Sequence, residues 1–278
     1  MNEILIFPSD ERQKYMKEYL QRLGYSCKFF ENIEDIENAS DIVLPIPSTE
    51  CGKIKSSSVS ISDFAKAVNK KCTVYGFLIS DSVFAKMLEE RRINYFDCYL
   101  CEQLKISNAY LTAQGILQNI LNDTKKSLKN NKILISGYGK TGSAICDIFY
   151  RNMADVTVLV RREEYKSLLE EKKIKCLLYQ EIKNKKSNFD YLINTVDTTV
   201  IDYSVLQNLN SSCKLLEIAS KPYGIDFDTA KKFGFKYEIL PSLPSKSTPS
   251  SAGEILAKTV DKYLKEEKLW NVSKWDLQ

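Results

Sequence analysis

Short apolar runs alternate with amphipathic stretches along the chain. In the first part, the pattern predicts strands at Ile4–Phe7, Ser26–Phe30, Ile42–Leu44 and Val74–Leu78, with helices at Glu11–Leu23 and near Ser62–Val68. This alternation is typical of a parallel sheet whose strands are joined by helical crossovers. Pro45 and Pro47 end the third run at the carboxyl end of its strand, where open α/β sheets bind ligands.

The same alternation resumes after a long amphipathic pattern from Asn108 to about Leu128, which predicts a connecting helix. The predicted elements that follow are strands at Ile133–Ser136, Val156–Val160, Lys175–Leu178, Tyr191–Asn194 and Leu215–Ile218, and helices after Gly142, at Glu163–Lys172 and at Phe227–Phe233. A segment rich in proline and serine, 241–249, is predicted as a loop before a final helix from Ser250 to about Lys268.

The chain has 278 residues, which is long enough to bury two cores. We therefore predict an α/β protein with two doubly wound parallel-sheet domains. Residues 1–114 with 250–278 form an N-terminal substrate domain, to which the C-terminal helix returns. Residues 115–249 form a Rossmann dinucleotide-binding domain.

Composition narrows the chemistry. The net charge is only +4, with 40 basic and 36 acidic residues interspersed, so no nucleic-acid partner is expected. No apolar run approaches the ~18 residues of a membrane span, and Glu3 stands where a signal peptide is basic, so we expect a cytoplasmic protein.

Cys98 and Cys101 form a C-x-x-C without a second ligand pair, so no metal site is expected. Two interpretations of this pair stay open, a redox pair or two small apolar residues. The chain has no histidine, so any general base is Asp, Glu, Lys, Tyr, Cys or water.

A glycine motif follows the first strand of the second series. Its residues are Gly137, Tyr138, Gly139, Lys140, Thr141 and Gly142. In a G-x-G-x-x-G between strand and helix, the glycines allow a tight turn, close approach of a pyrophosphate, and close packing of the helix on the strand. The motif therefore predicts a dinucleotide site.

The next strand ends in Arg161 and Arg162, about 20 residues beyond Gly142, where an NAD site usually has an acid for the ribose 2′-hydroxyl. A guanidinium instead suits a 2′-phosphate, so NADP is favoured over NAD as the cofactor. The alternative is that both arginines are merely solvated. Asn194 and Thr195 end a later strand and are expected to face the cofactor.

Several segments together resemble the A-subunit family of dipicolinate synthases. They are Asp10-Glu11-Arg12-Gln13, Leu44-Pro45-Ile46-Pro47, 108–115, the glycine motif, Asn194-Thr195, 219–227 and 243–253. The resemblance implies an NADP-dependent oxidoreductase that converts a dihydrodipicolinate-type intermediate of the lysine pathway to dipicolinate during sporulation, in the mother cell. It also implies that the chain works with a flavoprotein-like B subunit; a second copy of the chain is a further candidate partner.

A substrate with two carboxylates needs fixed cationic and neutral donors. Arg12 follows the first strand and Lys246 lies in the proline-rich segment, and we expect both to anchor carboxylates, with Ser220 and Thr112 as neutral donors. Three of the four have a structural alternative: Arg12 and Lys246 as solvated side chains, and Ser220 as part of a turn before Pro222.

Three positions depart from the family pattern: Gln114 replaces a glutamate, and Tyr223 and Ser245 replace glycines. The missing carboxylate changes the available proton chemistry, and the missing glycines bear on loop geometry. Two other functions therefore stay open. One is another two-domain NAD(P)-dependent dehydrogenase, and the other is a non-catalytic NADP-binding sensing or scaffold protein.

Overall fold

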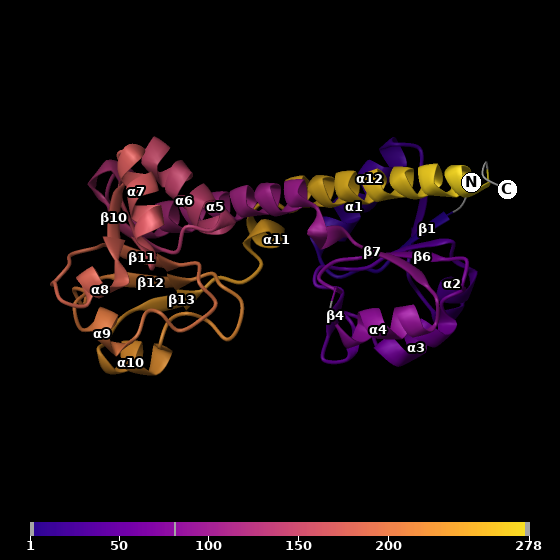
Figure 1. Cartoon of the computed structure of the whole chain (residues 1–278), viewed down its shortest axis with the longest axis horizontal. Coiled ribbons are helices and arrows are strands. Elements are labelled where there is room, and N and C mark those ends of the chain that lie inside the picture. The colour runs from indigo at the N-terminus through magenta and orange to yellow at the C-terminus, as the bar shows by residue number, and fades with distance from the viewer. Residues whose placement is uncertain (1–2, 81, 276–278) are drawn as a thin grey trace. The chain divides into compact units, whose positions relative to one another are not determined.

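The computed structural model describes the backbone of residues 3–80 and 82–275, and the side chains of residues 3–80 and 82–266 (Figure 1). The chain divides into two compact units. Unit 1 comprises Met1–Asn108 and Thr248–Gln278, and unit 2 comprises Ala109–Ser247. Helix α5 (Glu102–Asp123) contains the boundary between them. Each unit has its own parallel sheet and its own buried core.

Unit 1 is built on a sheet in the order β2-β1-β3-β6-β7, in which every neighbouring pair is parallel. Its strands are β1 (Glu3–Ile6), β2 (Ser26–Phe29), β3 (Asp41–Val43), β6 (Thr73–Gly76) and β7 (Asn94–Asp97). A small antiparallel hairpin of β4 (Thr49–Glu50) and β5 (Lys53–Ile54) follows β3. Because the strand order reverses between β1 and β3, this is a topological switch point, where ligands of open α/β sheets bind.

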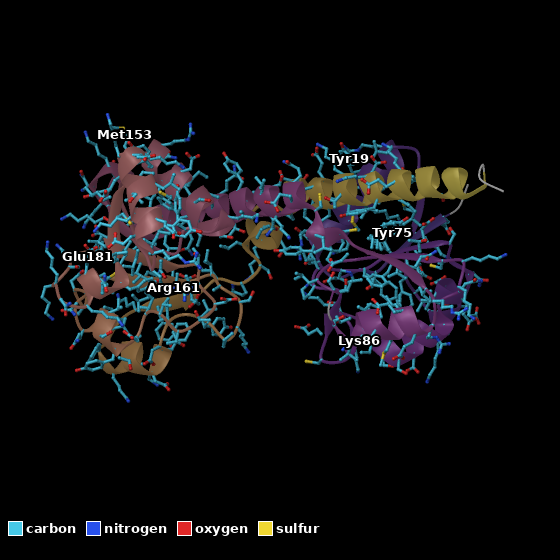
Figure 2. The ribbon with its side chains drawn as sticks, viewed as in Figure 1. Tyr19, Tyr75, Lys86, Met153, Arg161 and Glu181 are labelled. Atoms are coloured by element: carbon cyan, nitrogen blue, oxygen red, sulfur yellow. The ribbon has the colours of Figure 1, made fainter. Side chains whose placement is uncertain are left out.

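Helices cover both faces of this sheet. They are α1 (Glu11–Arg22), α2 (Ile33–Asn38), α3 (Ile61–Ala67), α4 (Val83–Glu90), the 3₁₀ turn η1 (Cys98–Leu100) and α12 (Pro249–Trp275). The period of two in β1 sends Ile4 and Ile6 to the core with α1 and α12, and Leu5 to the core with α2, α3 and α4. Tyr75 is fully buried in the first of these cores (Figure 2). Helix α12 packs closely on α1, because Gly253 presents no side chain to it.

Unit 2 is built on a six-stranded sheet in the order β10-β9-β8-β11-β12-β13, again entirely parallel. Its strands are β8 (Lys132–Ser136), β9 (Asp155–Val160), β10 (Lys175–Leu178), β11 (Tyr191–Asn194), β12 (Lys214–Glu217) and β13 (Tyr237–Ile239). Counted from β8, this is the order 3-2-1-4-5-6 of the Rossmann dinucleotide-binding fold.

Helices also cover both faces of the second sheet. They are α6 (Lys140–Arg151), α7 (Glu163–Glu171), α8 (Tyr179–Ile182), α9 (Tyr203–Leu206), α10 (Phe227–Lys232) and α11 (Leu243–Ser247), with the 3₁₀ turn η2 (Leu128–Asn130) before β8. In β8, Ile133 and Ile135 pack with α5 and α6, whereas Leu134 packs with α8, α9 and α10. The α/β, doubly wound fold class predicted from the sequence is confirmed.

Several predicted elements need correction. Helix α5 begins at Glu102 rather than Asn108 and ends at Asp123 rather than about Leu128, so both ends lie several residues earlier than predicted. The segment predicted as a continuous loop contains α11, in which Ser247 Oγ donates to the Leu243 carbonyl and Leu243 is buried. Strands β7 and β13 were not predicted; each lies at the edge of its sheet and is only partly covered. The β4–β5 hairpin and the short helices α2, α4, α8 and α9 were not predicted either. Within 3–80 and 82–275, no helix is both long and apolar enough to cross a membrane.

Candidate functional site

The glycine motif forms the turn from β8 into α6. Gly137 has a φ of 94°, a left-handed conformation that favours glycine. A Cβ at Gly142 would lie 2.2 Å from the carbonyl oxygen of Gly137, so the helix can approach the turn only because residue 142 lacks a side chain. Gly139 caps α6, and a Cβ there would meet nothing within 4 Å. The turn is therefore a cradle with open space beside the N–H groups of a helix start, as a pyrophosphate requires.

A cavity of about 530 Å³ lies beside this turn, at the carboxyl ends of β8, β9 and β11. It is lined by Gly137, Tyr138, Gly139, Lys140, Thr141, Gly142, Leu159, Val160, Arg161, Arg162, Tyr165, Tyr179, Thr195, Val196 and Asp197. The structure thus brings the whole glycine motif, both arginines and Thr195 to one cavity. Asn194 is the cofactor candidate that does not line it.

The two arginines are the charged groups of greatest interest in this lining. Arg161 (Figure 2) and Arg162 directly follow β9, and both side chains are exposed. Neither forms an ion pair with a carboxylate of the residues that the structure describes. The lining includes one acid, Asp197, which follows β11. The end of β9 is therefore a cationic edge whose donors are available to an anion.

Asn194 is buried within the fold rather than exposed to the cavity. Its Nδ2 donates to the Val196 carbonyl at 2.8 Å and to both carboxylate oxygens of Glu217 at 2.8 and 3.0 Å. Its Oδ1 accepts from Ser136 Oγ at 2.8 Å. Asn194 was expected to face the cofactor. In the structure, both polar atoms of its side chain bond to protein groups inside the fold instead.

Glu217 ends β12 and is fully buried. Besides Asn194, its carboxylate accepts from the backbone N–H groups of Ala219 at 2.9 Å, Gly224 at 2.9 Å and Ile225 at 3.1 Å. Burial raises the pKa of Glu217 above its ordinary value, although all of these donors favour the charged form. The carboxylate fixes the loop that follows β12, and sequence reasoning missed it because an acid at a strand end usually faces water.

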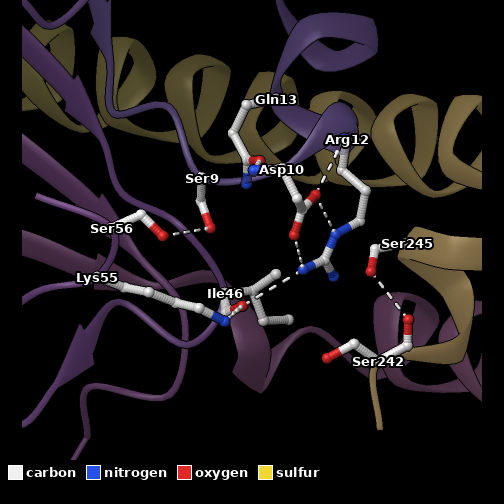
Figure 3. Close-up of polar contacts among 9 residues, drawn as sticks. All are labelled: Ser9, Asp10, Arg12, Gln13, Ile46, Lys55, Ser56, Ser242 and Ser245. Carbon is white, nitrogen blue, oxygen red and sulfur yellow. Dashed lines mark hydrogen bonds and ion pairs between the residues drawn. The ribbon is translucent and has the colours of Figure 1, made fainter. Parts of the chain in front are cut away.

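Arg12 is held at the switch point of unit 1 (Figure 3). Asp10 caps α1, and Arg12 donates to its carboxylate twice, Nε to Oδ1 at 2.9 Å and Nη2 to Oδ2 at 2.7 Å. The arginine side chain is only 7% exposed, so the alternative of a solvated residue is excluded. Burial acts to raise the pKa of Asp10, but the bonds and charge of Arg12 outweigh it and hold that pKa below its ordinary value.

A second cation joins Arg12 at this place. Lys55 follows the β4–β5 hairpin, and its Nζ donates to the Ile46 carbonyl at 3.1 Å; Arg12 Nη2 approaches the same oxygen at 3.4 Å (Figure 3). The two cations, Arg12 and Lys55, are accompanied by one carboxylate, Asp10, so this cluster carries a net positive charge. Sequence reasoning missed Lys55, because its position depends on the hairpin that folds it back toward the ends of β1 and β3.

The three other predicted anchors lie in unit 2, on different elements. Thr112 is half-buried on α5, and Lys246 is exposed on α11. Ser220 is exposed, and its carbonyl accepts from the Tyr223 N–H at 3.0 Å, so it belongs to the turn around Pro222. Arg12 lies in unit 1.

The three departures from the family pattern have different structural consequences. Tyr223 has a φ of 72°, so a tyrosine holds the left-handed conformation that a glycine adopts readily. Ser245 lies within α11 and needs no such conformation. Gln114 is half-buried on α5. A missing glycine therefore has a conformational cost at position 223 and none at position 245.

The C-x-x-C pair of unit 1 is enclosed. Cys98 and Cys101 are both buried, and burial raises the pKa of the Cys98 thiol well above its ordinary value. A protonated, covered thiol is a poor nucleophile, so the apolar interpretation of the pair is favoured. Among the described residues, no group of three Cys, Asp or Glu side chains is placed to hold a metal ion.

Comparisons with known proteins agree with this geometry. No protein-family model matches the chain. The A subunit of dipicolinate synthase from Bacillus subtilis (strain 168) is 25% identical over 243 residues, which cover 84% of this chain and 82% of that protein.

Solved structures extend the similarity to the backbone. The A subunit of dipicolinate synthase from Bacillus halodurans has a TM-score of 0.81 at 23% identity, over 95% of this chain and 97% of that one. Its counterpart from Bacillus subtilis has a TM-score of 0.82 at 21% identity, over 96% and 97%. A D-isomer specific 2-hydroxyacid dehydrogenase from Lactobacillus delbrueckii ssp. bulgaricus, in an NAD-complexed form, has a TM-score of 0.57 at 11% identity, over 96% and 97%. The chain therefore has a dehydrogenase-like fold, and in both sequence and backbone it resembles the A subunit of dipicolinate synthase.

Proposed function

We propose that the chain is an NADP-dependent oxidoreductase of dipicolinate synthase type, which converts a dihydrodipicolinate-type intermediate of the lysine pathway to dipicolinate during sporulation. The observation that carries the proposal is the cavity of unit 2, where the glycine turn meets two arginines that pair with no described carboxylate. The resemblance to the A subunit of dipicolinate synthase supports the choice of reaction. In this proposal unit 2 is the cofactor domain and unit 1 the substrate domain.

The residues of unit 2 are suited to hold a dinucleotide phosphate. The N–H groups at the start of α6 and the turn at Gly137 to Gly142 receive the pyrophosphate. Arg161 and Arg162 receive the 2′-phosphate, for which a planar guanidinium offers two parallel donors. Thr195 packs against the glycine turn, where a Cβ at Gly137 would lie 2.6 Å from Thr195 Oγ1. When bound, NADP⁺ would accept a hydride from the substrate ring.

The residues of unit 1 are suited to a carboxylate. Arg12 and Lys55 are already oriented, one by Asp10 and the other by the Ile46 carbonyl, so a carboxylate would meet fixed donors. The positive excess at this switch point favours an anion. Thr112, Ser220 and Lys246 remain proposed contacts to the substrate, with Lys246 the one cation among them.

Loss of the ring proton needs little help from the protein. Forming an aromatic pyridine ring makes the oxidation strongly downhill, so positioning of the substrate supplies most of the catalysis. A chain without histidine, and with Gln114 at the position of a family glutamate, is compatible with proton transfer to water.

The partners follow from the same proposal. A dihydrodipicolinate-type dicarboxylate is the substrate, and a flavoprotein-like B subunit is the partner within a two-subunit enzyme. A homo-oligomer of this chain is a further candidate assembly.

Two alternatives are kept because specific observations favour them. Another two-domain NAD(P)-dependent dehydrogenase would share the fold, as the 2-hydroxyacid dehydrogenase comparison illustrates. A sensing or scaffold protein would bind NADP without turnover, and Gln114 in place of a carboxylate favours it.

A turnover assay separates these functions. The purified chain, by itself and with a candidate B subunit, receives NADP⁺ and freshly generated dihydrodipicolinate; NADPH is followed by absorbance and dipicolinate by lanthanide luminescence. Formation of both products supports the proposal and shows whether the B subunit is needed. NADPH formation only with a different oxidisable substrate supports another dehydrogenase, and binding of NADP⁺ without turnover supports the sensing protein.

A further inference from the structure

A chain of hydrogen bonds runs from the cofactor cavity into the core of unit 2. Tyr179 lines the cavity, and its hydroxyl lies 2.7 Å from Ser136 Oγ. Ser136 Oγ lies 2.8 Å from Asn194 Oδ1, and Asn194 Nδ2 lies 2.8 and 3.0 Å from the two oxygens of Glu217. Ser136, Asn194 and Glu217 are all fully buried, so no water competes for these bonds.

The direction of every bond in this chain is fixed by its inner end. The partners of the Glu217 carboxylate are all donors, namely the Asn194 amide and three backbone N–H groups, so the carboxylate accepts in each of these bonds. The Val196 carbonyl can also only accept, so both hydrogens of the Asn194 amide point at these two groups. Asn194 Oδ1 therefore faces Ser136 as an acceptor and takes the single hydrogen of the serine hydroxyl. With that hydrogen committed, Ser136 can only accept from Tyr179.

The tyrosine hydrogen thus points away from the cavity. Burial raises the pKa of Tyr179 to about 12, so the phenol keeps this hydrogen at neutral pH. What the hydroxyl has left for a ligand is its free lone pair. Through Asn194 and Ser136, Glu217 therefore determines that the Tyr179 hydroxyl acts toward a ligand as an acceptor.

Tyr179 lies on the side of the cavity where the adenosine half of a dinucleotide is expected. It is close enough to Arg161 for that charge to act on it, and in this fold the end of the second strand meets the adenosine ribose. In an NAD site, an acid at this strand end accepts hydrogens from the ribose, but Arg161 cannot accept. A neutral acceptor at this place would suit a donor of the adenosine half, because it carries no negative charge beside a 2′-phosphate.

We propose that Tyr179 is a specificity-determining residue of the cavity that accepts a hydrogen bond from a donor of the adenosine half, and that Ser136, Asn194 and Glu217 are positioning residues that keep it an acceptor. This inference rests on the proposed dinucleotide function. The donor is the exocyclic amine of adenine or the 3′-hydroxyl of the ribose.

The test is a binding titration that needs no turnover. Wild type, Tyr179→Phe and the control Tyr203→Phe, which alters an exposed tyrosine away from the cavity, are titrated with three ligands. The ligands are NADP⁺, its hypoxanthine analogue without the exocyclic amine, and its 3′-deoxyribose analogue. Wild type should bind NADP⁺ about fivefold to tenfold more tightly than one of the two analogues, the size of one neutral hydrogen bond. Tyr179→Phe should lose that preference, and Tyr203→Phe should keep it.

A second variant tests the direction of the bonds. Ser136→Ala removes the acceptor of the tyrosine hydrogen, which can then turn toward the ligand. The preference for NADP⁺ over the analogue that lacks the donor should shrink, whereas a merely structural effect would weaken all three ligands equally. Unchanged preferences in Tyr179→Phe, or an equal loss for all three ligands, overturn the inference and leave the proposed function standing. No binding of NADP⁺ by wild type overturns both.

Discussion

Replacing Arg161 and Arg162 tests the choice of cofactor, because both side chains are exposed at the cavity and neither holds a carboxylate of the described residues. Changing both to alanine therefore breaks no ion pair within the described part of the chain and should leave the fold intact. A hydrogen bond to a charged group contributes about 1.5–3 kcal/mol, and exposed arginines belong at the lower end of that range. One arginine is then worth about tenfold in the dissociation constant, and the pair about tenfold to a hundredfold.

The assay is isothermal titration of the double variant with NADP⁺ and with NAD⁺ at one fixed salt concentration, since exposed charges are screened by salt. Affinity for NADP⁺ should fall by that factor, whereas NAD⁺ has no 2′-phosphate and should change by less than about threefold. Changing both arginines to glutamate should go further and reverse the preference, because a carboxylate repels the phosphate and accepts from a free 2′-hydroxyl. Arg151→Ala, an exposed arginine on α6 paired with Asp147, is the matched control. Equal losses for the two cofactors would refute the 2′-phosphate argument.

Three further sets of variants test other parts of the structure. Gly142→Ala places a Cβ 2.2 Å from the Gly137 carbonyl oxygen, so NADP⁺ binding should weaken at least about tenfold in titrations while circular dichroism shows a folded chain. Lys55→Met and, separately, Lys246→Ala should each raise the KM for the dicarboxylate about tenfold at unchanged NADP⁺ affinity; steady-state kinetics with an unchanged KM would remove that lysine as an anchor. Leu256→Ala truncates a side chain only 3% exposed in the core of unit 1, and should lower the unfolding free energy by about 2–5 kcal/mol in denaturant titrations.

The fold was predictable because its signal is local. Runs such as Ile133–Ser136 and Asp155–Val160 are largely apolar, as strands covered on both faces must be, and the helices between them fix a parallel arrangement. The misses occur where that signal fails. Strands β7 and β13, for example, lie at the edges of their sheets and are only partly buried. Helix α11 is short and begins with Leu243-Pro244, a composition shared with loops.

At the candidate site, too, the residues set by local sequence were predictable and those set by long-range contacts were not. The glycine turn was predictable, because strain and close approach exclude other residues at Gly137 and Gly142. Lys55 and Tyr179 were not, because each reaches its site through contacts between segments apart in the sequence. Asn194 was expected at the cofactor for its place at the end of β11, but the nearby Glu217 carboxylate draws its amide inward.

Carboxylates at the ends of parallel strands recur in both units, and their partners explain what they do. Asp97 ends β7 and accepts from the N–H groups of Leu78, Ile79, Ser80 and Tyr99. Glu217 ends β12 and accepts from Asn194 and three N–H groups of the following loop. In a chain without histidine, buried acids at this edge of a sheet would be the first candidates for a general base. Both carboxylates instead hold loops, and neither is available as a base. In the proposed reaction, aromatisation therefore supplies the driving force and positioned cations orient the substrate.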